Sequence, residues 1–330
     1  VNQLTHDKRS LVVTYTTRNY LNLKNSILRK FGHIPETITL MTYFSFLYSF
    51  CYRPFLSYRF KAKGITFETN PYWFAKKFVK NNNQINRDYF VDQHNRLYSN
   101  RIALLLELQS TLEDVNERLE KYFDSLYIDE VQDLAGNDFN FLKSISQAKL
   151  EMIFVGDFHQ HTFGTSHDRN TNINLYSSYK EYLDSFNQMG FLLDEDTLIN
   201  SYRCSPTVCT FIRDNLEIKI FSNKIDNTKI KIVNSKEEAD NIYHDNNIVK
   251  LFYSEHYKYI CNSRNWGESK GENCYEDVCV VLNPTTQKLF KKNKLNDLKP
   301  LTKNKLYVAC SRANNDLYLV DGKFYKKYKM

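Results

Sequence analysis

Short apolar runs and longer amphipathic stretches alternate along this chain of 330 residues. The run Leu11–Tyr15 predicts a buried strand, and the stretch Arg18–Phe31 predicts the helix that follows it. The apolar face of this helix is expected to carry Leu21, Leu28 and Phe31. Gly32 predicts the end of the helix. Alternation of strand and helix is typical of α/β proteins built around parallel sheets.

The pattern changes between Tyr48 and Phe123, where aromatic and basic residues precede a helix-like stretch at Ser99–Lys121. The alternation then resumes. Helices are predicted at 205–216 and 303–313 and strands at 277–282 and 317–320, with an Asn-, Lys- and Asp-rich stretch through residue 247. We therefore predict two α/β lobes, residues 1–197 and 198–330, with a short, mostly helical insertion at about 50–122 in the first.

Two predicted strands end in polar residues that suit chemistry on phosphates. The run Leu126–Ile128 ends in the adjacent acids Asp129-Glu130, and the run Met152–Val155 is followed by Gly156-Asp157 and then Gln160. The carboxyl ends of parallel strands meet at one sheet edge, where α/β proteins bind ligands. An isolated acidic pair would more often cap or solvate a strand end, but two strands that deliver polar groups to one edge favour nucleotide hydrolysis. One acid can hold Mg²⁺ and its neighbour can orient water.

Composition is that of an ordinary globular protein, with 42% hydrophobic and 25% charged residues. No apolar run of about 20 residues and no signal peptide is evident, so a cytoplasmic protein without a membrane partner is expected. The net charge of +7 fits a polyanionic partner, but an excess spread over this length is weak evidence by itself.

The seven cysteines do not form a CxxC arrangement, and their number is odd. A disulfide framework is therefore not expected. The pairs Cys204/Cys209 and Cys274/Cys279 leave open a four-thiolate zinc site, but small buried apolar side chains are the better interpretation.

Several sequence blocks together resemble the UvrD/Rep-type superfamily 1 helicases. Residues 129–133 read Asp-Glu-Val-Gln-Asp, like the family's Asp-Glu-x-Gln-Asp, and residues 156–160 match its Gly-Asp-x-x-Gln. The remaining blocks are Val12–Arg18, Met41–Phe46, Ile199–Cys204 and Leu306–Ala313, which are similar to the family's Thr-Phe-Thr-Asn-Lys, Thr-Phe-His-Ser-Phe, Asn-Tyr-Arg and Tyr-Val-Ala-x-Thr-Arg-Ala segments. The blocks occur in family order and extend the resemblance from about residue 11 to residue 320.

The resemblance implies two RecA-like parallel-sheet lobes of the P-loop NTPase type, with ATP and Mg²⁺ as cofactors. It assigns Asp129 to the Mg²⁺ shell, Glu130 to the attacking water and Gln160 to sensing the γ-phosphate of ATP. It also implies that Arg203 and Arg312 of the second lobe act as arginine fingers when the lobes close.

The implied partner is single-stranded DNA, and the residues alone do not distinguish DNA from RNA. The family's nucleic-acid contacts correspond to Thr14, Tyr15, Arg18, Thr42 and Phe163. The rings of Tyr15 and Phe163 would stack on bases, while Arg18 and Thr17, which replace the family's Lys and Asn, suit phosphate contact.

Two departures from the family pattern affect these expectations. The family places a Gly-x-Gly-Lys-Thr phosphate loop before the Thr-Phe-Thr segment, and only Val1–Ser10 precede Leu11 here. We expect that a preceding segment is missing from this sequence, which alone should hydrolyse ATP poorly; the alternative is an ATPase that has lost its loop. The Lys-Gly block at Lys270-Gly271 lacks the family's preceding His, with Gly267 in its place, so contacts from that block are in doubt.

The leading hypothesis is an ATP-driven single-stranded DNA translocase or helicase. Such a motor would fit a larger DNA-processing or phage-defence assembly, with a nuclease as one kind of protein partner. Two alternatives stay open: a DNA-stimulated ATPase switch that unwinds nothing, and a degenerate nucleic-acid-binding scaffold.

Overall fold

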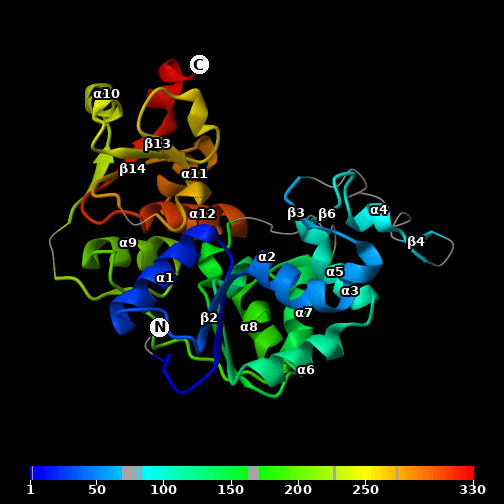
Figure 1. Ribbon diagram of the computed structural model, residues 1–330. Helices are drawn as coiled ribbons and strands as arrows, with labels where there is room; N and C mark the ends of the chain where they lie inside the picture. The colour runs from blue at the N-terminus through cyan, green and yellow to red at the C-terminus, as the bar shows by residue number, and fades with distance from the viewer. Residues whose placement is uncertain (2, 69–79, 82–83, 163–170, 226–227, 273) are drawn as a thin grey trace. The chain divides into compact units, whose positions relative to one another are not determined.

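The computed structural model describes residues 1, 3–68, 80–81, 84–162, 171–225, 228–272 and 274–330. The chain divides into two compact units: unit 1 is Val1–Asp157 with Gly164–Phe191, and unit 2 is Phe158–Phe163 with Leu192–Met330. Each unit is built on a parallel sheet flanked by helices (Figure 1). The predicted α/β fold class is therefore confirmed, while the division at residue 197 stays a prediction.

The sheet of unit 1 has the order β2 (Ile38–Thr42), β1 (Ser10–Thr14), β7 (Ser125–Asp129) and β8 (Glu151–Val155), with every pair parallel. Strand β1 is buried along its length, and its three central residues, 11–13, are apolar, as expected for a strand covered on both faces. Strand β8 lies at the edge of the described sheet and is half-buried apart from its exposed first residue.

Helix α1 (Thr17–Phe31) packs on β1 and β2. Its contacts with the sheet come from a stripe of residues at intervals of four: Leu23, Ile27 and Phe31. Leu21 is 51% exposed, so its predicted place on the apolar face is wrong; a spacing of six residues turns it away from Ile27. The predicted helix end is confirmed, because Gly32 adopts φ 75° and donates its N–H to Leu28 O.

Helices α7 (Gly136–Ile145) and α8 (Tyr179–Gln188) pack through aromatic rings. The ring of Phe186 lies 5.8 Å from that of Phe139 on α7 and 6.5 Å from that of Phe154 on β8. Phe186 thus joins both helices to the half-buried strand.

Short elements form the chain between β2 and β7, which includes the predicted insertion at about 50–122. In chain order they are α2 (Tyr43–Ser45), a π-helical turn (Phe46–Tyr52), α3 (Arg53–Phe60), β3 (Gly64–Thr66), β4 (Lys80–Asn81), β5 (Gln84–Ile85), α4 (Arg87–Phe90), β6 (Arg96–Tyr98), α5 (Ile102–Leu108) and α6 (Leu112–Tyr122). The predicted continuous helix at 99–121 is wrong, because Ser110 takes φ 54° and separates α5 from α6.

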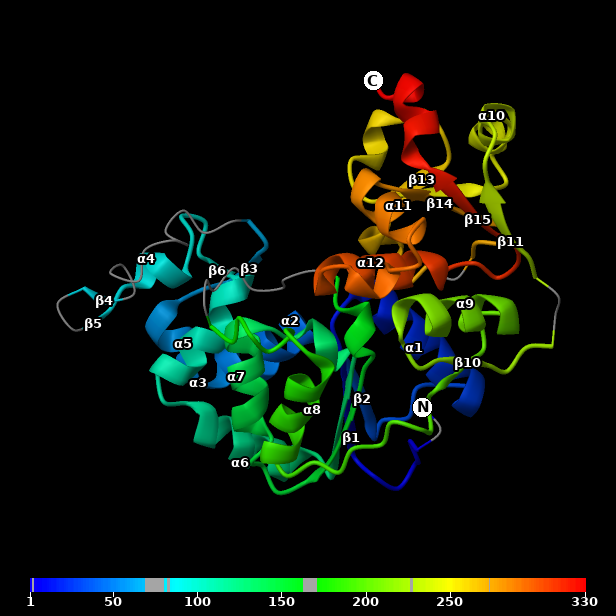
Figure 2. The same cartoon turned by 180° about the vertical axis from the view of Figure 1, so that it is seen from behind.

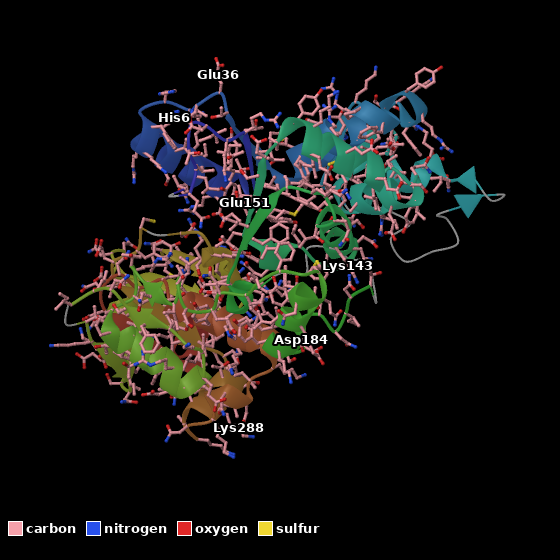
Figure 3. All side chains as sticks on the ribbon, turned by 90° about the horizontal axis from the view of Figure 1, so that it is seen from below. His6, Glu36, Lys143, Glu151, Asp184 and Lys288 are labelled. Carbon is pink, nitrogen blue, oxygen red and sulfur yellow. The ribbon has the colours of Figure 1, made fainter. Side chains whose placement is uncertain are left out.

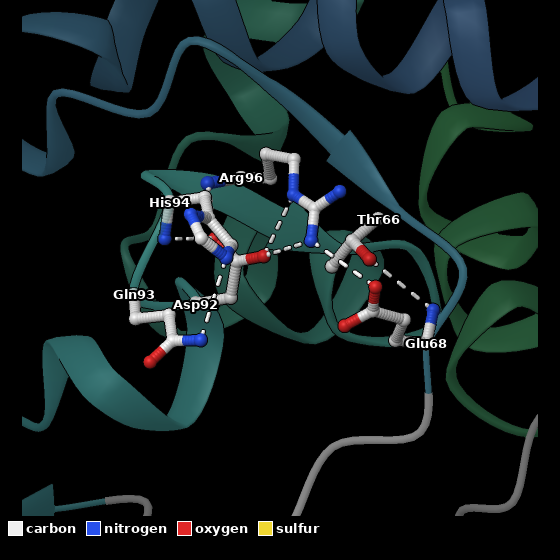
Figure 4. A network of polar contacts seen from close by, with 6 residues as sticks. All are labelled: Thr66, Glu68, Asp92, Gln93, His94 and Arg96. Atoms are coloured by element: carbon white, nitrogen blue, oxygen red, sulfur yellow. Dashed lines mark hydrogen bonds and ion pairs between the residues drawn. The ribbon is translucent and has the colours of Figure 1, made fainter.

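A polar network joins β3 to β6 within this insertion (Figure 4). The buried carboxylate of Asp92 accepts hydrogen bonds from His94 N at 2.9 Å, Arg96 N at 2.7 Å and Arg96 Nε at 2.7 Å. The same guanidinium reaches Glu68 at 3.3 Å. Because Asp92 satisfies both backbone and side-chain donors, it fixes the turn that leads into β6.

The sheet of unit 2 has the order β11 (Ile230–Val233), β15 (Leu317–Asp321), β14 (Val278–Leu282), β12 (Val249–Phe252) and β13 (Ser263–Asn265), all parallel (Figure 2). Successive residues of β14 face two separate cores, as the period of a strand requires. Val278, Val280 and Leu282 pack in one, and Cys279 and Val281 pack in the other.

The helices of unit 2 are α9 (Pro206–Leu216), α10 (Lys236–His244), α11 (Pro284–Phe290) and α12 (Pro300–Cys310). A short parallel pair, β9 (Asn200–Ser201) and β10 (Phe221–Ser222), precedes the sheet. Helix α12 begins and ends three residues earlier than predicted, and the stretch up to residue 247 contains β11 and α10. Within the described residues, no helix is long and apolar enough to cross a bilayer.

Candidate functional site

Three predicted site residues lie side by side at the carboxyl edge of the sheet in unit 1. Thr14 pairs in register with Thr42 on one side and with Asp129 on the other. The Thr14 hydroxyl donates to Asp129 Oδ2 at 3.4 Å. The sheet itself thus brings a metal candidate and two nucleic-acid candidates together.

Glu130 is held in a left-handed turn directly after β7. Its φ is 57° and its ψ is 41°, a conformation that is uncommon for residues other than glycine. Asn19 Nδ2 in the first turn of α1 donates to Glu130 Oε1 at 3.0 Å, and Gln132 Nε2 donates to Glu130 Oε2. Strained backbone with a fixed carboxylate is often found at functional sites.

Gln132 connects the residues that follow β7 with those that follow β8. Its side chain is fully buried, and its Oε1 accepts a hydrogen bond from Asp157 N at 3.0 Å. A Cβ atom at Gly156 would approach Gln132 Oε1 more closely than 3 Å and would lie 2.9 Å from Val131 Cγ1. Glycine at position 156 therefore leaves the space that the Gln132 side chain occupies.

The oxygen groups at this edge fit Mg²⁺. This ion prefers one or two carboxylates and completes its shell with water and phosphate oxygens, so it does not need a cage of protein ligands. Asp129 offers such a carboxylate, with the Thr14 hydroxyl beside it. The described residues contain no group of three or more His, Cys, Asp or Glu that could hold a metal ion.

Aromatic rings gather beside Thr14 and Thr42. The Tyr15 ring lies 5.5 Å from Phe44, which lies 5.1 Å from Phe67. Tyr15 and Phe44 are half-buried, and Phe67 is 71% exposed. Tyr43, in contrast, is a core residue: its hydroxyl donates to Asp138 Oδ1 at 2.9 Å, and burial raises its pKa well above the usual value.

The remaining nucleic-acid candidates differ in how they are placed. Arg18 lies exposed in the first turn of α1. Phe163 lies outside the described residues.

In unit 2, the two predicted arginine fingers meet at Ser311. Arg203 Nη1 donates to Ser311 O at 3.2 Å, and Arg312 Nη2 donates to Ser311 Oγ at 3.2 Å. Arg312 is almost fully buried and also donates to Val308 O at 3.1 Å and Glu272 O at 3.4 Å. Arg203 is half-buried, so its guanidinium has fewer constraints than that of Arg312.

The surroundings of Cys204 favour the thiolate form of its side chain. The hydrogen bond that it shares with the Cys209 thiol lowers the pKa of Cys204, and Ser201, Arg203 and Arg312 act in the same direction. Cys204 and Cys209 are buried in one apolar core, and Cys279 is buried too, as the sequence predicted. The prediction is wrong for Cys274, which is exposed.

Gln160 belongs to a short turn of unit 2 that α12 holds in place. Asn304 Nδ2 donates to His161 O at 3.0 Å and to Phe158 O at 3.4 Å, on both sides of Gln160. The structure thus groups Thr14, Thr42, Asp129 and Glu130 in unit 1, and Arg203 with Arg312 in unit 2. The sequence-based prediction missed Asn19, which no motif marked, and Gln132, which is part of a quoted block but received no role.

The geometry defines an α/β protein with paired acids at the carboxyl edge of a parallel sheet. The family model of the UvrD/REP helicase N-terminal domain matches residues 6–183, more than half of the chain. The chain therefore belongs to the UvrD/REP helicase family, as its motifs predicted.

Among solved structures, the chain is similar to one described as "The structure of PRRSV helicase". The sequence identity is 12% and the TM-score is 0.43, and the similarity covers 99% of this chain and 49% of that chain. This chain thus spans about half the length of that helicase. No curated protein matches it.

Proposed function

We propose that this protein is an ATP-dependent motor that moves along single-stranded DNA. The observation that carries the proposal is the position of Asp129 and Glu130 at the end of β7, with Glu130 held by two side-chain hydrogen bonds. Family membership supports nucleoside triphosphate and nucleic acid as the two ligands. Movement along DNA, as opposed to a DNA-stimulated switch, is part of the proposal.

Within this proposal, Glu130 orients the water that attacks the γ-phosphate of ATP. The bonds from Asn19 and Gln132 fix both of its oxygens, so little reorganisation is needed when the reaction begins. Asp129 would hold Mg²⁺, which neutralises charge on the phosphates when bound. Gln160 would contact the γ-phosphate.

Arg203 and Arg312 would stabilise the charge that develops on the transferred phosphoryl group. Such arginines contribute on the order of 10³–10⁵ in rate in related phosphoryl-transfer systems. Their common contact with Ser311 supports a joint role, because the backbone carbonyl of this residue holds Arg203 and its hydroxyl holds Arg312.

Nucleic acid would bind at the edge formed by Thr14, Tyr15, Arg18 and Thr42. Arg18 offers a charge for phosphate, and the Tyr15 ring offers a face for a base. The predicted role of Phe163 remains a prediction.

The replacement Glu130→Gln, made in a chain that carries the family's phosphate loop, tests the proposal. We expect turnover to fall by about 100-fold or more while ATP binding is retained, since the amide keeps the volume but loses the charge that orients water. Glu113→Gln on the exposed side of α6 is the matched control. Near-normal turnover in Glu130→Gln would show that the site is wrongly assigned, and DNA-stimulated hydrolysis without directional movement would favour the switch.

A further inference from the structure

The positive charge of the chain is concentrated in one short segment of unit 2. Residues 284–305 contain seven lysines and a single acid, Asp297, which gives a net charge of +6. The whole chain carries +7, so all its other residues together contribute only +1. The expectation that the charge is spread along the chain is therefore wrong.

Five of these lysines lie on one rigid stretch and are exposed. They are Lys288, Lys291, Lys292, Lys294 and Lys299. The stretch includes the end of α11 and the turn that leads to α12, and Lys288 lies at the margin of unit 2 in Figure 3. Buried Leu295 and Leu298 anchor it to the core, and Lys294 N donates to Leu289 O at 3.0 Å. The lysine backbones are thus fixed before any ligand arrives.

These lysines are not neutralised within the protein. None of the five forms an ion pair among the residues that the structure describes, whereas Lys219 pairs with Asp196 at 2.9 Å and Lys231 with Asp316 at 2.8 Å. Like charges held close together repel one another, which costs stability. A surface of this kind is stabilised when a polyanion supplies the missing negative charge.

We propose that these five lysines, named here the lysine surface, bind the phosphate backbone of a nucleic acid. The lysine surface lies in unit 2, whereas Thr14, Tyr15, Arg18 and Thr42 lie in unit 1, so it is an additional contact. Ammonium groups on flexible stems suit phosphates without reading sequence. The choice of nucleic acid over an acidic membrane rests on the proposed function and on the helicase family.

The test compares two variants of the full chain that lose the same charge. The first carries Lys288→Gln, Lys291→Gln, Lys292→Gln and Lys294→Gln. The control variant replaces four exposed lysines outside the segment by Gln: Lys143, Lys149, Lys180 and Lys236. Binding to a labelled oligothymidylate of about 20 nucleotides is titrated without nucleotide over a series of salt concentrations. Thermal unfolding confirms that both variants fold.

We expect the first variant to bind about 10-fold more weakly at low salt. The slope of log affinity against log salt should become shallower by up to about 3, since each phosphate contact contributes about 0.7 on a single strand. The control should keep the wild-type slope, and four Lys→Arg replacements in the segment should restore it.

Each result has a distinct meaning. Equal slopes in the two Gln variants would overturn the lysine surface, as would selective loss of binding to vesicles of anionic lipid with unchanged DNA binding. A shallower slope in the first variant alone, together with no ATP hydrolysis by a wild-type chain that carries the family's phosphate loop, would sustain the lysine surface and refute the proposed motor. Normal DNA-stimulated hydrolysis with equal slopes would support the proposed motor and refute the lysine surface.

Discussion

The close approach of Gly156 to Gln132 makes a quantitative prediction about the acidic edge. In Gly156→Ala, the new Cβ would contact Gln132 Oε1 and Val131 Cγ1 more closely than real Cβ atoms do. The flexible end of Gln132 must then move, which breaks its hydrogen bond with Asp157 N. The bond from Gln132 Nε2 to Glu130 is lost with it.

The expected cost follows from these contacts. Inserting a methyl group into a filled site costs about 1–3 kcal/mol, and each of the two lost hydrogen bonds contributes about 0.5–1.5 kcal/mol. We therefore expect Gly156→Ala to destabilise unit 1 by about 2–6 kcal/mol. In a Gln132→Ala background the clash with Oε1 is absent and only the contact with Val131 remains, so the same substitution should cost about 1–2 kcal/mol less.

Hydrogen exchange of the amides in β7 and β8 is the appropriate assay. Unfolding of a chain with two units need not be a two-state process, whereas local exchange reports the stability of the strands concerned. Gly64→Ala is the matched control, because a Cβ there meets only Arg96 Cγ at 3.9 Å and should change stability by less than about 0.5 kcal/mol. If the free-energy costs of Gly156→Ala and Gln132→Ala add to within about 0.5 kcal/mol in the double mutant, the reasoning is refuted.

Three further predictions concern separate parts of the molecule. Arg203→Ala should lower hydrolysis far more than ATP affinity and leave folding intact. Arg312→Ala should also destabilise unit 2 by about 2–4 kcal/mol, because it leaves a buried cavity and removes the hydrogen bonds to Val308, Glu272 and Ser311. Kinetics measure the effect on hydrolysis, and thermal unfolding measures the effect on stability. Tyr15→Ala should weaken binding of a labelled single strand by about 1–3 kcal/mol if the ring stacks on a base. Arg9 donates to Asp124 and lowers the pKa of that carboxyl from 3.8 to about 2. The stabilisation by this ion pair should therefore be present above about pH 4 and disappear as the pH falls toward 2. The unfolding midpoints of wild type and Asp124→Asn, measured against pH, should converge at this low pH.

Two of these three predictions have a control variant. Tyr58→Ala, at a ring that is 92% exposed on α3, should leave DNA affinity unchanged, and an equal loss in both tyrosine variants would argue against stacking. Asp7→Asn, which removes an exposed acid two residues before Arg9, is the control for Asp124→Asn. Unchanged hydrolysis in Arg203→Ala would mean that the contact between Arg203 and Ser311 has only a structural role.

The arrangement of polar groups at the edge of unit 1 could be predicted because it follows from the period of parallel strands. Once the runs before Asp129 and Gly156 are assigned as neighbouring parallel strands, their carboxyl ends must meet at one edge. The hydrogen bonds that orient Glu130 could not be predicted in this way. Asn19 reaches it from a helix 111 residues earlier in the chain, and no local pattern encodes that contact.

Other differences have local physical causes. Leu21 satisfied an apolar pattern, but the stripe through Ile27 determines which face of α1 meets the sheet. The helix predicted over 99–121 is interrupted because Ser110 adopts a left-handed conformation that its sequence does not signal. The charge of residues 284–305, in contrast, was visible in the sequence and was missed because it was averaged over the whole chain.

The segment from Thr14 to Asn19 connects the two proposed activities of unit 1. Thr14 donates to Asp129 and Asn19 donates to Glu130, while Tyr15 and Arg18 between them are the proposed nucleic-acid contacts. Arg18 and Asn19 are adjacent in one helical turn, so a shift of Arg18 toward phosphate also moves Asn19. The bond from Asn19 to Glu130 is 3.0 Å long, and a displacement of about 1 Å would break it.

DNA binding and water orientation should therefore be coupled through Asn19. Loss of a hydrogen bond to a charged group costs about 1.5–3 kcal/mol, so Asn19→Ala should reduce DNA-stimulated hydrolysis by about 10-fold or more. The discriminating measurement is the ratio of stimulated to unstimulated rates, with Asn22→Ala on the exposed face of α1 as the control. A lower ratio would mean that the bond transmits the presence of DNA to Glu130. If both rates fell by the same factor, Asn19 would orient Glu130 whether DNA is bound or not, and the coupling would have to arise elsewhere in the chain.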